Sequence, residues 1–235
     1  WFAVFLVPLL LLYRDHAHRP AQELEVPSGP APRSTLRFLI ANTILSDALL
    51  ALFVFGGIYA AAVFGWDSGR LAALATGLTV AGFLGVLSCI PLDRLYGTRV
   101  IANVCCGLIV IIGIFILGLD PQHFWIWPSR MIEAIGLSTS ELAFVLASLM
   151  IGATSTALQS AMRAMFLPYA MAERAGRSFG FFALSGKSTA FIGPMLVSLI
   201  IAAFESTKAG ISVILVMIAV GAIFLSDAKA KRHES

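Results

Sequence analysis

The chain has 235 residues, of which 59% are hydrophobic and only 12% are charged, and its formal net charge is +3. Soluble domains carry roughly a quarter charged residues, so this composition indicates an integral membrane protein. The net charge is too small to point to a nucleic-acid partner.

The charged residues cluster between long apolar blocks. Six of these blocks are complete and reach about the ~20 residues that a membrane-spanning helix needs. Lipid cannot hydrogen-bond the backbone, so each is predicted to be a helix, which makes the chain an all-α membrane protein with a six-helix bundle over residues 35–227. The seventh block, at the start of the chain, is predicted to be the end of a truncated helix. The blocks are Trp1–Tyr13, Leu36–Phe64, Leu71–Leu92, Val100–Leu119, Leu142–Phe166, Phe179–Phe204 and Ala209–Ser226.

Residues 14–34 are rich in Pro, Ser, Ala and charges, which predicts a flexible linker. If this linker is cytoplasmic, alternating spans place twelve of the sixteen Lys and Arg residues on the cytoplasmic side, three on the other side and Lys187 within a span. The positive-inside rule predicts such an imbalance. The same alternation makes residues 228–235 a cytoplasmic tail.

Two charged residues, Asp47 and Lys187, fall inside predicted spans. Each lies ten residues beyond an arginine at the cytoplasmic end of its span. At about 1.5 Å per helical residue, both side chains are expected roughly 15 Å deep, near the middle of the bilayer. A charge facing lipid alone there costs about 2.5–3.5 kcal/mol. We therefore expect the two to lie close together and to border a central cavity.

Two interpretations of Asp47 and Lys187 remain open. They form either a structural ion pair between two helices or a functional pair in which Asp47 accepts a proton under the influence of Lys187.

The block Leu142–Phe166 contains a polar stripe, in which Gly152, Ser155, Gln159 and Arg163 are spaced three or four residues apart. This spacing puts them on one helix face. The small residues favour helix packing, whereas Gln159 is a candidate hydrogen-bonding group for a polar solute. Arg163, near the cytoplasmic end, is expected to reach toward the membrane surface.

Two further features are candidates for conformational change. Gly56-Gly57 and Gly193-Pro194 interrupt apolar blocks, and interruptions of this kind are found in the moving or binding elements of transporters. In the predicted cytoplasmic hairpin, Asp93, Arg94, Gly97 and Arg99 combine an acid, two bases and a turn glycine, which predicts contacts between two helix ends, although an ordinary charged hairpin has the same composition.

No cofactor or metal site is predicted. His16 and His18 lack a third ligand, and Cys89, Cys105 and Cys106 lack metal-ligand spacing. The spans contain no Ser/His, paired-Asp or His-Glu-x-x-His arrangement, so an intramembrane enzyme is not expected.

The Asp93–Arg99 hairpin resembles a loop signature of the major facilitator superfamily. The segments Phe55–Ala60, Gln159–Arg163 and Phe182–Pro194 are similar to its vacuole-effluxer-like branch, which includes an autophagy-related vacuolar amino-acid exporter and bacterial homologues. Asp47 falls on an acidic position of this branch. The candidate solute or coupling residues are Asp47, Lys187, Gln159, Asn42 and Ser46.

The resemblance implies a twelve-helix secondary transporter, of which this chain holds the end of helix six, the central linker and helices seven to twelve. Helices seven and ten of that fold line the cavity, and helix eleven lies beside seven. The implied partners are the lipid bilayer, a small polar solute such as an amino acid, protons, and an N-terminal six-helix half. The implied activity is efflux by alternating access in a bacterial inner (plasma) membrane. The alternative is a six-helix binding subunit that needs a separate energising partner.

Overall fold

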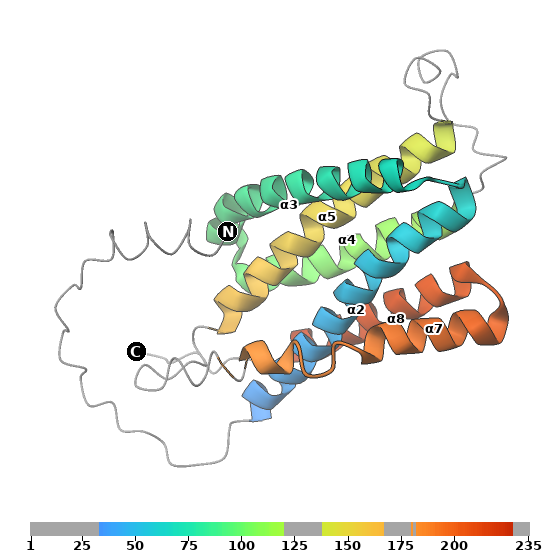
Figure 1. The fold of residues 1–235 in the computed structure, drawn as a ribbon. Helices are drawn as coiled ribbons and strands as arrows, with labels where there is room; N and C mark the ends of the chain where they lie inside the picture. Colours follow the sequence, from blue (N-terminus) through green and yellow to red (C-terminus); the bar gives the residue numbers. More distant parts are fainter. Residues whose placement is uncertain (1–32, 120–137, 167–179, 181, 228–235) are drawn as a thin grey trace, which may run out of the picture.

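The computed structural model describes residues 33–119, 138–166, 180 and 182–227, and its regular structure there is helical (Figure 1). The predicted end of helix six (1–13), the linker up to residue 32 and the tail 228–235 lie outside the described residues. The helices are α2 (Arg33–Phe64), α3 (Ser68–Tyr96), α4 (Thr98–Gly118), α5 (Thr139–Phe166), α7 (Ile192–Phe204) and α8 (Thr207–Asp227).

Five of the described helices, all except α7, are long and apolar enough to cross a membrane. They coincide with five of the predicted blocks, which confirms the all-α membrane class. α7 has only 13 residues, a length of about 20 Å against a hydrocarbon core of about 30 Å. The prediction of one helix through Phe179–Phe204 was therefore wrong, because a non-helical segment precedes α7.

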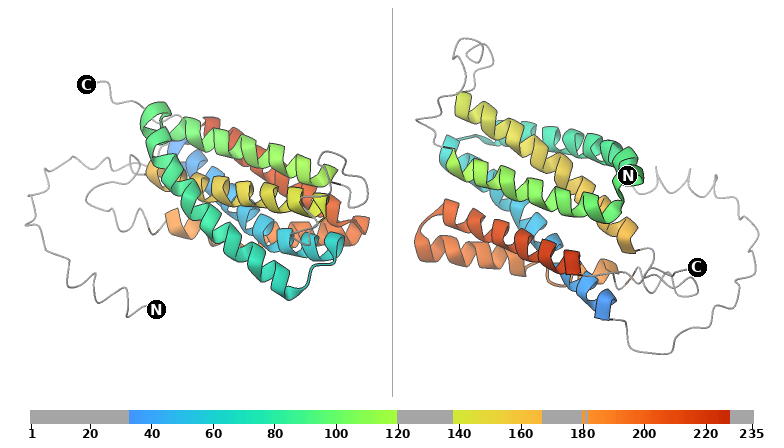
Figure 2. Two further views of the ribbon diagram at one scale, coloured as in Figure 1. Left: turned by 90° about the horizontal axis from the view of Figure 1, so that it is seen from above. Right: turned by 180° about the vertical axis from the view of Figure 1, so that it is seen from behind.

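The helices pack side by side along a roughly common long axis in all three views (Figures 1 and 2). α2 packs along α8 and also contacts α7, whereas α3 and α4 both pack on α5. α4 also packs on α8 and so connects the two groups. α2 and α5 contact each other in few places.

Small residues allow α3 and α5 to approach closely. A Cβ added to Gly152 of α5 would lie 3.0 Å from the Leu78 side chain and 3.2 Å from the Leu78 carbonyl oxygen. Across the same interface, the Thr156 hydroxyl donates a hydrogen bond of 2.9 Å to the Gly82 carbonyl. Such small-residue contacts with an interhelical hydrogen bond are typical of helix packing in membranes.

Hydroxyl groups on the outside of the bundle are satisfied within their own helices. Thr76, Ser88 and Ser198 each donate to the carbonyl four residues earlier, at 2.9 Å. These bonds let hydroxyl side chains face the bilayer without an unsatisfied donor.

Candidate functional site

The chain between residues 182 and 204 is a helix interrupted by a turn. Residues 182–185 are helical, 186–191 form turns, and α7 begins at Ile192. The Ser188 amide still donates to the Leu184 carbonyl at 2.8 Å, and the Ile192 amide donates to the Thr189 carbonyl at 2.7 Å. We call residues 186–191 the break.

The predicted interruption, Gly193-Pro194, lies just after the break and inside the first turn of α7. Proline is tolerated there because its missing amide hydrogen has no acceptor within the helix. Gly193 is buried, and a Cβ added to it would lie 2.6 Å from the Asp47 carbonyl oxygen. Gly193 thus allows α7 to contact α2 directly.

Polar side chains of α2 hold the helical residues before the break. The Asn42 amide donates to the Ser185 hydroxyl at 3.1 Å, and the Thr43 hydroxyl donates to the Ser185 carbonyl at 2.7 Å. Gly186 lies against Ser46, with an added Cβ 3.1 Å from its hydroxyl oxygen. Backbone groups freed at an interruption need such partners in a membrane.

A cavity of about 780 Å³ lies between α2, α5 and the break. Its volume falls within the range of small-molecule sites. α2 and α5 both line it, as do residues 182–190. Three kinds of residue surround it: the uncharged polar residues Asn42, Ser46 and Gln159, the cations Arg163 and Lys187, and an apolar remainder that includes Leu45, Leu49, Phe53, Leu158, Met162 and Phe182.

The structure separates the side chains of Asp47 and Lys187. Lys187 is exposed and lines the cavity, whereas Asp47 is 3% exposed, lies outside the cavity lining and faces Thr189 in the break. No ion pair joins the two, since the ion pair of the described part of the chain is Arg70–Glu141. The expected ion pair is therefore absent from the described residues and only Lys187 lines the cavity, so neither interpretation of Asp47 and Lys187 as a pair gains support from this geometry. Asp47 Oδ1 and Thr189 Oγ1 are buried without a hydrogen-bond partner among the described residues.

The polar stripe of α5 divides into two parts. Gly152 and Ser155 are buried, and Gly152 packs against α3. Gln159 and Arg163 are exposed and line the cavity. The packing and solute interpretations therefore apply to different residues of the same stripe.

The predicted cytoplasmic hairpin consists of one residue, Gly97, between α3 and α4. Its φ of +84° belongs to the region that favours glycine, and its amide donates to the Asp93 carbonyl. Arg99 donates to the carbonyls of Leu225 and Ser226 at 3.1 and 3.2 Å. The hairpin therefore contacts the end of α8 through Arg99. Asp93 forms no ion pair with Arg94 or Arg99 in the described region. A role in gating remains a prediction.

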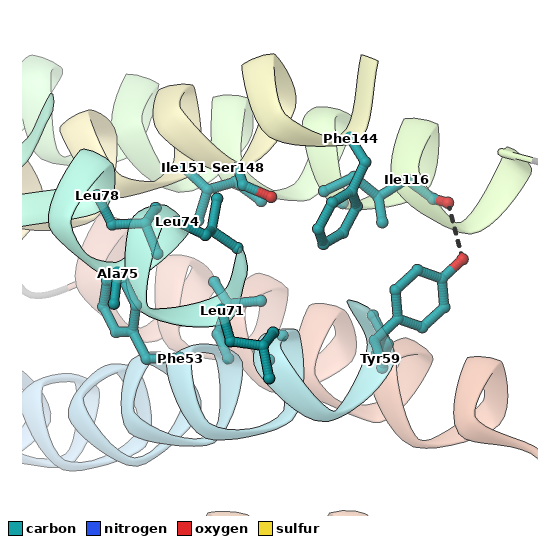
Figure 3. Close-up of a pocket in the computed structure, with 15 residues that line it drawn as sticks. Phe53, Tyr59, Leu71, Leu74, Ala75, Leu78, Ile116, Phe144, Ser148 and Ile151 are labelled. Carbon is teal, nitrogen blue, oxygen red and sulfur yellow. Dashed lines mark hydrogen bonds between the residues drawn. The ribbon is translucent and has the colours of Figure 1, made fainter. Parts of the chain in front are cut away.

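Gly56 and Gly57 line a second, smaller cavity of about 130 Å³ between α2, α3, α4 and α5 (Figure 3). Its lining is mostly apolar, and the Tyr59 hydroxyl beside it donates to the Ile116 carbonyl at 3.3 Å. α2 continues as a helix through both glycines. Their predicted role in movement stays a prediction.

Sequence reasoning missed a polar cluster at the end of the bundle where α3 and α5 begin. Glu141 accepts hydrogen bonds from Trp66 Nε1 at 2.6 Å, Arg70 Nη1 at 3.1 Å and the Ser138 amide at 2.7 Å. The Ser138 hydroxyl in turn accepts from the Glu141 amide at 3.2 Å. This reciprocal pair is a capping box, and the sequence Ser138-Thr-Ser-Glu141 was the signal that could have revealed it.

Among the described residues, no group of three His, Cys, Asp or Glu side chains could hold a metal ion.

Multi-pass helical bundles in which an interrupted helix borders a cavity are found among membrane transporters. A family model described as vacuole effluxer Atg22 like matches residues 30–234. The chain therefore belongs to this family, which is of the major-facilitator type, and the match points to a transporter rather than an enzyme. The alternative of a separate binding subunit gains no support from the match. Comparisons with curated proteins and with solved structures found no match.

Proposed function

We propose that this protein is a secondary active transporter that exports a small polar solute, such as an amino acid, by alternating access. The observation that carries the proposal is the cavity of about 780 Å³ between α2, α5 and the break, whose largely apolar lining includes three uncharged polar side chains and two cations. Transporters bind solute and coupling ion near the bilayer midplane at interrupted helices, where backbone and polar side chains face a cavity instead of lipid.

In this proposal Asp47 is the coupling residue. Asp47 is 3% exposed, its side chain faces Thr189 in the break, and its backbone lies against Gly193 at the start of α7. Asp47 Oδ1 is buried without a hydrogen-bond partner among the described residues, which makes an ionised carboxylate costly there. A protonated carboxyl is neutral and can donate a hydrogen bond to Thr189 Oγ1. Proton uptake at Asp47 would therefore change how tightly α2 holds the break, which links protonation to helix movement.

The complete pathway in this proposal needs a second six-helix half, as the major-facilitator type of fold implies. The two halves would enclose the solute between them and rock about the cavity. Following the resemblance to bacterial members of the family, we place the protein in the bacterial plasma membrane.

The test is transport by the full-length protein in proteoliposomes under an imposed proton gradient, with radiolabelled amino acids as solutes. Asp47→Asn keeps the side-chain shape and removes the titratable group. We expect it to abolish gradient-driven accumulation while solute exchange without a gradient persists. The matched control is Asp67→Asn at the exposed N-cap of α3, which should transport normally. Undiminished accumulation by Asp47→Asn would exclude Asp47 as the coupling residue, and a lack of transport of any amino acid by the wild type would exclude this solute class.

A further inference from the structure

Two cations line the main cavity, and the described residues around it supply no counter-charge. Lys187 and Arg163 both line it, and neither forms an ion pair within the part of the chain that the structure describes. The described residues that line the cavity include no Asp or Glu, and Asp47 is buried outside this lining. A positive charge at the depth expected for Lys187 is costly unless an anion or water compensates it, whereas Arg163 lies nearer the cytoplasmic end.

A backbone hydrogen bond, and not a side-chain contact, fixes the position of Lys187. Its amide donates to the Leu184 carbonyl at 3.0 Å, within the turn that follows Ser185. Ser185 is bonded to Asn42 and Thr43 of α2. The ammonium group is therefore presented from a fixed turn and stays free to contact a ligand.

Arg163 approaches the same space from α5, one helical turn beyond Gln159. An ammonium from the break and a guanidinium from α5 that line the same cavity can contact one anionic group together. Bonds between such cations and a carboxylate are charge-assisted, and they are roughly twice as strong as neutral hydrogen bonds.

We propose that this cavity recognises its solute through an anionic group, a carboxylate, which Lys187 and Arg163 bind. The inference rests on the proposed transport function and deepens it. The amide and hydroxyl groups of Asn42, Ser46 and Gln159 serve the polar remainder of the solute, and the leucine and phenylalanine side chains around them contact its apolar part. A solute of the same size without a negative group binds far more weakly.

The anionic phosphate of a lipid headgroup carries the same chemistry, so the experiment distinguishes the two sources. The full-length protein is placed in nanodiscs of phosphatidylcholine alone or with phosphatidylglycerol. Binding of three probes of similar shape is measured by calorimetry: leucine, 4-methylpentanoate, which keeps the carboxylate and lacks the amine, and leucinamide, which lacks the carboxylate.

We expect leucine and 4-methylpentanoate to bind and leucinamide to bind at least about tenfold more weakly. Lys187→Gln and Arg163→Gln should each weaken 4-methylpentanoate binding by about tenfold or more. Lys187→Arg keeps the charge and should restore binding to within a few-fold. Lys208→Gln removes an exposed cation at the start of α8 and should change nothing.

Equal binding of leucinamide and 4-methylpentanoate, no binding of either carboxylate, or an equal effect of Lys208→Gln would overturn the inference. Loss of probe binding when phosphatidylglycerol is added would also overturn it, because the site would then hold a lipid headgroup. A wild type that transports neutral solutes but binds no carboxylate would refute only the anion site. Lys187-dependent binding without any transport would refute only the transport function.

Discussion

At the scale of single residues, the two charges expected inside the membrane have different surroundings. Asp47 is enclosed where α2 meets the break, and Lys187 faces the cavity. The depth estimate from the sequence predicted that Asp47 and Lys187 lie at a similar depth. The residues that precede them, Ser46 and Gly186, are indeed in contact range. It could not give the direction of the Lys187 side chain, because a non-helical turn destroys the rotational phase that a continuous helix would fix.

In the polar cluster of Trp66, Arg70, Ser138 and Glu141, we expect Glu141 to contribute most to stability. Its carboxylate accepts from Trp66, Arg70 and Ser138. Glu141→Ala leaves these donors without their acceptor, which should lower the free energy of unfolding by about 2 kcal/mol. Thermal unfolding in detergent, followed by tryptophan fluorescence, measures the effect. Lys208→Ala is the control, and an unchanged midpoint in Glu141→Ala would show that the cluster contributes little.

At the scale of elements, the sequence revealed the cause of the interruption but not its position. Pro194 has no amide hydrogen and cannot donate to the carbonyl four residues earlier, so the missing hydrogen bond belongs to the turn that precedes it. The structure accordingly has non-helical residues at 186–191 and a helix that contains Gly193-Pro194. The hydrogen bonds from α2 that support the break are tertiary contacts, which residue spacing does not encode.

Thr43 tests whether these bonds hold the break. Its hydroxyl donates to the Ser185 carbonyl at 2.7 Å as well as to Leu39 of its own helix. Thr43→Val has nearly the same shape and should cost about 1 kcal/mol of stability, with slower transport. Thr76→Val is the matched control, because the Thr76 hydroxyl bonds the Ala72 carbonyl of its own helix. Equal behaviour of the two variants in unfolding and transport assays would remove this role from Thr43.

Gly193 tests the contact between α7 and α2. A Cβ there would lie 2.6 Å from the Asp47 carbonyl oxygen and 3.0 Å from the carbonyl carbon. Gly193→Val should force the two elements apart and cost about 1–3 kcal/mol, as overpacking does. At Gly107 an added Cβ meets nothing within 4 Å, so Gly107→Val should be tolerated. If both variants unfold at the wild-type temperature, α7 does not pack as closely as described.

At the scale of the whole molecule, contacts between distant residues agree with the alternation of spans derived from charge. Arg99 at the start of α4 bonds the end of α8, and Arg70 near the start of α3 bonds Glu141 near the start of α5. Each pair joins two ends that the alternation puts on the same side of the membrane. A missed or additional span between them would have separated their ends.

Sequence patterns predicted five of the six complete spans as long helices, because length and hydropathy alone determine whether a segment can span a bilayer, but they did not predict the interruption in Phe179–Phe204. They did not predict which helices pack together. The α3–α5 interface depends on where glycines such as Gly82 and Gly152 face each other. The sequence of one helix does not reveal which residues of another helix it will face. The cavity forms only when the helices have packed together. The separate sequences of α2 and α5 could therefore predict only part of its lining.

The central claim is that the cavity between α2, α5 and the break is the solute pathway, and cysteine accessibility tests it most directly. In full-length protein with Cys89, Cys105 and Cys106 replaced by Ala, Ala183→Cys lies in the cavity lining and Leu199→Cys on the 57% exposed outer face of α7. In membranes, an anionic methanethiosulfonate reagent should label Ala183→Cys at least about tenfold faster than Leu199→Cys, and saturating solute should slow only the former. Equal labelling of the two positions, or labelling of Ala183→Cys that solute does not affect, would contradict the account.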